Sequence, residues 1–173
     1  MDSFMEHMIK QRRKGSDIFK SVLIVIAAII LSLLVTPIFL VFPEAISIWP
    51  LTVAAIFYGA YRLICRFSVE YEYVLTNGEL DIDKIVNRKR RKRLITIHSK
   101  SFIEFGKVDS SKKHREDKNQ LVKTIDASAN SPVHPDYYAI FFKNGQKMKL
   151  VFNPTQKMIE EFKVYAPRVI EDF

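Results

Sequence analysis

The sequence predicts an α+β membrane protein: a two-helix transmembrane hairpin, then an antiparallel β-sheet or partial barrel closed by a C-terminal amphipathic helix. The first reason is charge, because Glu44 is the only ionised side chain within residues 21–61. Residues 67–173 instead hold 20 Lys or Arg and 15 Asp or Glu. Their apolar residues alternate at the period of a β-strand until a helical period begins near the C-terminus. This division excludes a simple soluble protein, and a single cysteine excludes a disulfide framework and a cysteine zinc site.

The first apolar segment, residues 21–42, is long enough to cross a bilayer. It has 22 uncharged residues, of which 16 are Val, Leu, Ile or Phe. As a helix it would be roughly 33 Å long, against a hydrocarbon core of about 30 Å. Its insertion is favoured by roughly 5–10 kcal/mol. A cleaved signal peptide is the competing interpretation, but its apolar core would be shorter and no second apolar helix would follow directly.

A second apolar segment, residues 45–65, begins two residues later, so that residues 21–66 are predicted to form the transmembrane hairpin. Ala55 and Gly59 lie four residues apart and give the second helix a face of small side chains. That face can pack on the alanines of the first helix or on a second copy of the chain. The first alternative needs no oligomer, and the second makes the protein a homo-oligomer.

The charges that flank the two helices predict their orientation. Basic residues stand before the first helix and after the second, whereas the connecting turn holds only Glu44. By the positive-inside rule both termini are cytoplasmic, which makes this a multi-pass protein of the inner cell membrane. Residues 1–20 then form a basic cytoplasmic segment. Its apolar side chains predict a short helix on the inner leaflet or, alternatively, a frayed tail; they are Phe4, Met5, Met8 and Ile9.

The cytoplasmic domain, residues 67–173, begins with a β-hairpin. Asn77 and Gly78 interrupt an alternating pattern and favour a type I′ turn, in which both residues need positive φ. The turn fixes a register with Leu75 opposite Leu80, Tyr73 opposite Ile82 and Val69 opposite Val86. On the other face Glu72 lies opposite Asp83, which favours a nearby Lys or Arg. Paired catalytic carboxylates are the weaker alternative, because no nucleophile or metal ligand accompanies them.

A second hairpin is predicted around Asn144-Gly145. Its register places Tyr137, Ala139 and Phe141 opposite Phe152, Leu150 and Met148 on one face. The other face of the first strand is apolar as well, because it carries Tyr138, Ile140 and Phe142. This outer row is either covered by another part of the chain, which we favour, or offered to a partner.

Three further strands are predicted at residues 93–98, 102–108 and 121–127, for a total of about seven, with a hydrophilic loop at 109–120. The chain then forms a helix with Asn153 as its N-cap and Pro154 at its first position. Its apolar stripe would cover the open end of the sheet, and Pro167 would end it; the stripe consists of Met158, Ile159, Phe162, Tyr165 and Ala166.

About seven strands in a meander followed by one helix is the outline of a pleckstrin-homology-like (PH-like) domain. The chain also resembles a family through its two N-terminal apolar helices, the hairpin YEYVLTNGELDIDKI with a basic run behind it, and NPTQKMIEEFKVYAPR. This family comprises uncharacterised small bacterial membrane proteins, mainly from anaerobic Gram-positive bacteria, with a PH-like cytoplasmic domain. The resemblance implies a location and an architecture, and it brings no catalytic residues.

The strongest candidate for a binding site is a run of six cations, Arg88, Lys89, Arg90, Arg91, Lys92 and Arg93. Near an anionic leaflet each contributes about 1 kcal/mol, so the run contributes up to roughly 6 kcal/mol. We therefore expect it to dock the domain on acidic lipid headgroups or on an acidic protein partner. A merely solvated loop is the alternative. Phosphoinositide-binding PH domains use cations around their first strand-to-strand loop, which here is the tight Asn77-Gly78 turn, so headgroup-specific binding is not expected.

The function expected from the sequence is that of a membrane-anchored, non-enzymatic interaction or scaffold module without cofactor. A structural subunit of an oligomeric membrane complex is the alternative. Nucleic-acid binding ranks third, because no aromatic residue is interleaved with the basic run and residues 67–173 carry a net charge of only +5. No catalytic site is expected, since common nucleophile and phosphate-loop motifs are missing from the sequence. No metal site is expected either, because the histidines have no suitable spacing; they are His7, His98, His114 and His134.

Overall fold

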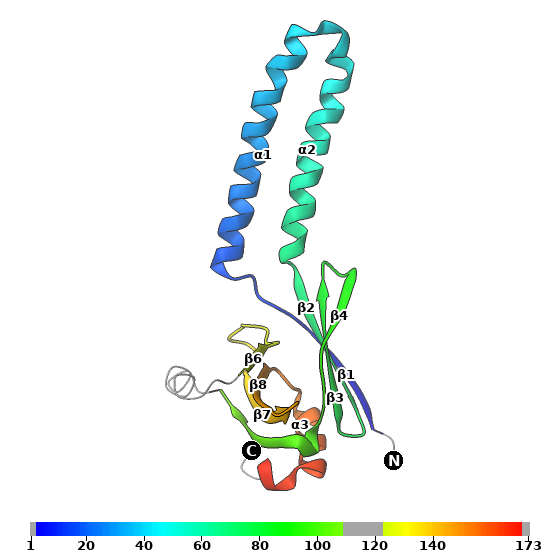
Figure 1. Cartoon of the computed structure of the whole chain (residues 1–173), viewed down its shortest axis with the longest axis vertical. Coiled ribbons are helices and arrows are strands. Elements are labelled where there is room, and N and C mark those ends of the chain that lie inside the picture. The colour runs from blue at the N-terminus through cyan, green and yellow to red at the C-terminus, as the bar shows by residue number, and fades with distance from the viewer. Residues whose placement is uncertain (1–2, 109–122, 171–173) are drawn as a thin grey trace. The chain divides into compact units, whose positions relative to one another are not determined.

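The computed structural model describes residues 3–108 and 123–170 of the chain (Figure 1). The chain divides into two compact units. One is the helical unit, Arg13–Ser68, and the other combines the chain up to Arg12 with the chain from Val69 onward. The predicted loop at 109–120, which includes His114, lies outside the described residues.

The helical unit contains α1 (Gly15–Val41), a 3-10 turn (Pro43–Ile48) and α2 (Trp49–Ile64), followed by a 3-10 turn at Cys65–Phe67. Both helical segments are long and apolar enough to cross a membrane, and only 6% of the apolar window of each is buried within the chain. The α1 helix begins six residues before the predicted start, because Asp17 accepts a hydrogen bond from the Lys14 N–H and so caps the first turn.

Polar side chains within the two helices satisfy one another locally. Thr36 and Thr52 donate to the carbonyl oxygens of the residues four positions before them. The Trp49 indole N–H donates to the Thr36 hydroxyl at 3.1 Å and links the loop ends of α1 and α2. The hydroxyl groups of Thr36 and Thr52 and the indole of Trp49 thus all have hydrogen-bond partners. Such pairing lowers the cost of placing these groups in hydrocarbon.

The first sheet has four antiparallel strands in the order β1-β2-β3-β4. They are β1 (Phe4–Lys10), β2 (Val69–Thr76), β3 (Glu79–Val86) and β4 (Arg90–His98). The predicted helix over Phe4, Met5, Met8 and Ile9 is therefore wrong, and so is the frayed tail. A seven-residue helix gains little by itself, whereas β1 pairs along all seven residues with β2 and buries Ile9. The N-terminal segment thus belongs to the sheet unit.

The β2–β3 hairpin has the predicted register: Leu75 pairs with Leu80, Tyr73 with Ile82, Val69 with Val86 and Glu72 with Asp83. Asn77 and Gly78 both have positive φ, +50° and +81°, as a type I′ turn requires. Between β3 and β4 the pairing shifts, because Ile82 faces Ile95 while Asp83 faces Arg93. Leu94 is the extra residue of this β-bulge.

The second sheet has the order β5-β7-β8-β6. Its strands are β5 (Phe102–Lys107), β6 (Lys123–Asp126), β7 (Tyr137–Lys143) and β8 (Gln146–Phe152). The β7–β8 hairpin has the predicted register around Asn144-Gly145. The described residues form eight strands rather than about seven, and the second sheet is no meander, because β6 lies parallel to β8 at the edge. Alternation identifies strands but does not say which sheet edge each one joins.

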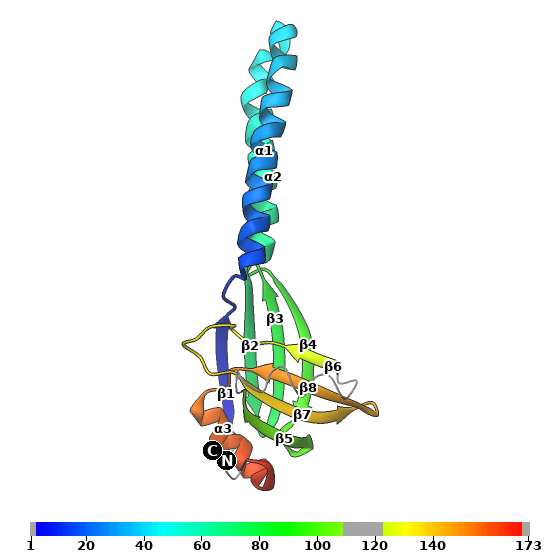
Figure 2. The same cartoon turned by 90° about the vertical axis from the view of Figure 1, so that its left-hand side faces the viewer.

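The two sheets cross and enclose the core, and α3 (Gln156–Tyr165) lies at one end (Figure 2). Met158, Ile159 and Phe162 of α3 are buried, as predicted. The Phe162 ring contacts Phe102 at 5.6 Å and lies within 6.2 Å of Phe152, with the rings tilted toward edge-on contact.

The predicted cap of α3 is wrong in its position. The N-cap is Thr155, whose hydroxyl accepts the Met158 N–H at 3.3 Å. Asn153 lies two residues earlier and is buried. Its side chain binds the segment between β6 and β7: its Oδ1 accepts the Ala129 N–H at 2.7 Å, and its Nδ2 donates to the Pro135 carbonyl at 2.8 Å. Asn153 thus fixes a loop rather than a helix end.

Candidate functional site

The six consecutive cations do not form one loop. The turn between β3 and β4 is short, with Asn87 and Arg88 at positive φ and the Lys89 N–H donating to the Val86 carbonyl at 3.2 Å. Strand β4 begins at Arg90, so the last four cations belong to a strand. In a strand, successive side chains point to opposite faces of the sheet. The basic run is therefore divided between the two faces.

Three of the arginines pair with carboxylates on the outer face of the first sheet. Arg88 lies 3.4 Å from Glu70, and Arg91 pairs with Glu72 and lies 3.7 Å from Asp83. Arg93 pairs with Asp83 as well, and its Nη1 lies 2.7 Å from Asp81. The cation expected beside Glu72 and Asp83 is thus Arg91.

These carboxylates are not on a solvated face. Glu70, Glu72 and Asp83 are 7%, 3% and 3% exposed. Burial raises the pKa of Glu72, and Arg91 acts in the opposite direction. The hydrogen bond to Asp83 raises the pKa of Arg93 above its ordinary value. A buried carboxylate without a cation is costly, so the first role of these arginines is to neutralise Glu70, Glu72 and Asp83.

Lys89, Arg90 and Lys92 remain exposed, and within the described residues none of them has an ion pair. They are the cations that the site can offer to an anionic surface. They surround the β3–β4 turn, where Val86 pairs with both Val69 and Arg90. The end of β1 and the start of β2 lie at this same end of the sheet, because the Gln11 N–H, just after β1, donates to the carbonyl of Val69, the first residue of β2, at 3.0 Å. Both chain connections to the helical unit therefore leave from the end of the sheet that carries the free cations.

The outer row of the second sheet is partly covered. Tyr138 and Ile140 are half-buried, whereas Phe142 is 60% exposed. The Tyr138 hydroxyl donates to Glu104 at 2.6 Å, and its ring lies so close to Gly106 that a Cβ there would come within 2.9 Å. The chain itself therefore covers Tyr138, whereas Phe142 at the end of the row remains exposed to solvent.

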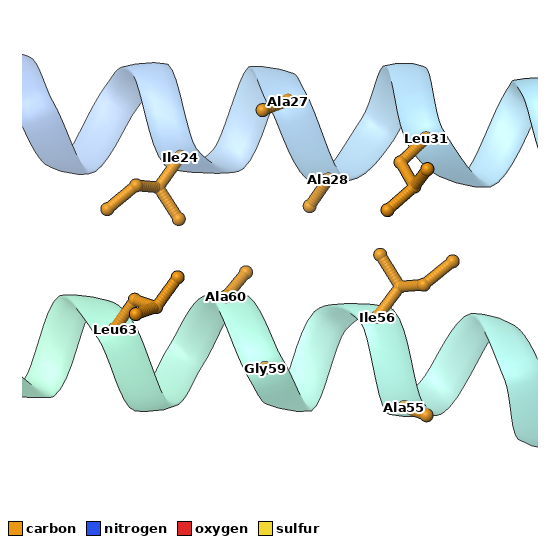
Figure 3. Close-up of a pocket in the computed structure, with 9 residues that line it drawn as sticks. All are labelled: Ile24, Ala27, Ala28, Leu31, Ala55, Ile56, Gly59, Ala60 and Leu63. Atoms are coloured by element: carbon orange, nitrogen blue, oxygen red, sulfur yellow. The ribbon is translucent and has the colours of Figure 1, made fainter.

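The helical unit has an apolar groove of about 340 Å³ between α1 and α2 (Figure 3). Ala28 and Ala60 point toward each other across it and are the buried residues of the two helices. Ala55 and Gly59 line the groove, but a Cβ on Gly59 would meet no atom within 4 Å. The buried contact between α1 and α2 thus involves Ala60, the residue after the predicted pair, rather than Gly59.

The described part of the chain has no group of three His, Cys, Asp or Glu side chains placed to hold a metal ion. His98 accepts the Lys100 N–H and packs on Tyr165, and His7 packs on Tyr73. Two features escaped the sequence reasoning, strand β1 and the Asn153 cluster. No local signal distinguishes β1, because its exposed residues Phe4 and Met8 are as apolar as Met5 and Ile9 on the other face.

Residues 1–172 match the family model of the bacterial PH-like domain (DUF6106). The chain belongs to this family. The match confirms the resemblance and the PH-like fold class expected from the sequence, and it covers the helices as well as the sheets. No curated protein matches the chain, and no solved structure matches it either. PH-like domains are generally non-catalytic interaction modules, so membership supports that general role for this chain.

Proposed function

We propose that this PH-like protein is a membrane-anchored, non-enzymatic module whose β3–β4 turn docks on anionic lipid headgroups. In this proposal α1 and α2 span the inner cell membrane as a hairpin, with both termini cytoplasmic, as the flanking basic residues indicate. The free cations Lys89, Arg90 and Lys92 supply the contact.

One observation carries the proposal: the free cations and both connections to the helices share one end of the first sheet. Four residues separate β1 from α1, and four separate α2 from β2. Four intervening residues allow at most about 18 Å between the flanking Cα atoms. The covalent chain thus keeps the turn within reach of the headgroups wherever the helices enter the bilayer.

The expected energy is smaller than the sequence suggests. Three free cations contribute about 3 kcal/mol near an anionic leaflet, half the value for six. Because the helices already hold the domain at the bilayer, this energy orients the domain rather than recruiting it. The interaction should weaken with salt, since the Debye length is about 8 Å at physiological ionic strength.

The test uses the full chain reconstituted in phosphatidylcholine vesicles with and without 30% phosphatidylglycerol, a composition that we choose to resemble an anionic leaflet (about −30 mV at its surface). Hydrogen exchange of the β3–β4 turn amides reports docking. We expect slower exchange in the anionic vesicles, and we expect Lys89→Ser with Arg90→Ser to weaken docking about 30-fold, the equivalent of two lost contacts. Lys107→Ser with Lys157→Ser removes the same charge from exposed positions elsewhere in the sheet unit.

Equal exchange in neutral and anionic vesicles would refute lipid docking. If the turn then determines which acidic protein is captured from native membranes, the partner is a protein. Cross-linking between copies through residues 54–59 would instead support the oligomeric subunit. An equal effect of the control pair would show that total charge matters and the turn does not.

A further inference from the structure

A second cationic feature lies where the two sheets diverge, between the edge strands β4 and β6. A groove of about 400 Å³ opens there. Its charged lining comes from Lys92 and Arg93 of β4, Lys123 of β6 and Lys143 of β7. Ile125 and Met148 contribute apolar surface. A groove of this size is within the range of small-molecule sites in proteins.

Two of these lysines occupy positions that continue the core. Lys123 is two residues before Ile125 on β6 and pairs with Met148, a buried residue of the inner face. Lys92 pairs with Lys84, which is two residues beyond the fully buried Ile82. Because side chains two apart on a strand share a face, these lysines replace apolar residues on the inner faces of both sheets.

The charges of the lysines are not compensated within the groove. No Asp or Glu is found among the described residues that line it. The Arg93 guanidinium is directed to Asp83 and Asp81, and the Lys143 ammonium donates to the Thr96 carbonyl at 3.3 Å. Like charges placed directly opposite one another, as in Lys84 and Lys92, destabilise a sheet. A bound anion would remove that repulsion.

We propose that this groove binds a phosphate-bearing ligand, either a soluble phosphomonoester or a lipid headgroup. The Arg93 guanidinium is already paired with Asp83, so the charges that remain for a ligand are the lysine ammonium groups, which bind phosphate as point charges. An acidic peptide added as a strand is disfavoured, because the bulge at Leu94 interrupts the regular pairing edge of β4.

The test measures binding of glycerol 3-phosphate and inorganic phosphate by isothermal titration calorimetry, with the full chain in neutral phosphatidylcholine nanodiscs. We expect saturable binding that Lys123→Gln with Lys143→Gln weakens at least tenfold, since two charge-assisted contacts are lost. Lys107→Gln with Lys157→Gln is the control, because both side chains are exposed and neither lines the groove. The control should bind like the wild type.

The source of the phosphate is distinguished by repeating the titration in nanodiscs that contain phosphatidic acid. A lipid headgroup in the groove would compete with glycerol 3-phosphate and lower its apparent affinity, whereas a soluble ligand would bind unchanged. Should the double variant unfold, Lys143→Gln alone at its exposed position is expected to weaken binding at least threefold. Non-saturable binding, or equal weakening by the control pair, would overturn the proposal. Lys92 belongs to both features, but neither pair of substitutions changes Lys89, Arg90 or Lys92, so the two proposals can fail separately.

Discussion

The ring of Tyr165 lies directly against Gly78, so that a Cβ at position 78 would come within 2.6 Å of Tyr165 Cδ2. Tyr165 ends α3, and Gly78 forms the β2–β3 turn. The Gly78 carbonyl also accepts the Ser99 N–H at 2.8 Å and the Ser99 hydroxyl at 2.9 Å. The tip of the first hairpin is thereby fixed between α3 and the start of the second sheet.

Gly78→Ala is expected to lower the free energy of unfolding by about 2–4 kcal/mol. The new side chain would stand at a residue with positive φ and would also be overpacked against Tyr165. Gly145→Ala is a matched control, since Gly145 has φ +76° in the same type of turn but no atom within 4 Å of its Cβ position. It should cost only about 1 kcal/mol. Urea unfolding followed by circular dichroism of the chain in detergent micelles measures both, and equal losses would contradict the close contact.

Asn153→Ala is expected to cost about 2–4 kcal/mol, because it leaves several buried polar groups without partners. The Tyr73 hydroxyl belongs to the same cluster: it donates to the Ala127 carbonyl at 2.6 Å and accepts the Asn153 N–H at 3.4 Å. Thr155→Ala removes only a helix cap, which is worth about 1 kcal/mol. The same unfolding measurement separates the two roles. Rescue of position 153 by Ser, a good cap residue, would show that Asn153 acts as a helix cap after all.

Arg91→Gln should destabilise the sheet unit increasingly as the pH rises. Burial raises the pKa of Glu72 in the folded state, so the folded chain prefers the protonated form, and stability is lost as the pH increases above the unfolded value of 4.5. Arg91 opposes this effect, and its removal enlarges the loss by about 1–3 kcal/mol at neutral pH, given its partial exposure. Unfolding midpoints between pH 4.5 and 7.5 should show a steeper decline, which Glu72→Gln in the same chain abolishes.

His7 should make stability decrease in mild acid. Burial, and then the charge of His134, lowers the pKa of His7 below 6.5 in the folded state. The unfolded chain therefore binds a proton more readily, and stability is lost as the pH falls below 6.5 toward the folded value. Unfolding midpoints at pH 7.5 and 5 should differ less in His7→Gln than in the wild type, and His134→Gln should recover part of the difference. An unchanged difference in His7→Gln would show that other groups cause it.

Local patterns predicted the elements whose partners are close in the sequence. The Asn77-Gly78 and Asn144-Gly145 turns fix two registers, because a two-residue turn allows only one alignment of its strands. The length and apolarity of residues 21–42 and 45–65 predicted two helices by composition alone. The stripe of α3 could be identified for the same reason, since its helical period is complete within ten residues.

Contacts across long sequence separations were decided only by the tertiary structure. Met5 pairs with Leu75 seventy residues away, and Asn153 binds the backbone of Ala129 and Pro135. The residues next to Met5 and Asn153 in the sequence therefore do not indicate that the first lies in a strand and that the second fixes a loop. The basic run shows the same limit: its six charges could be counted from the sequence, but which three are bound to buried carboxylates depends on cross-strand pairing. By itself the sequence determined the charges and the elements with local signals, the two apolar helices, the two Asn-Gly hairpins and the stripe of α3, because these are local properties. The fold decided which cations remain free, because ion pairing and burial depend on distances between strands.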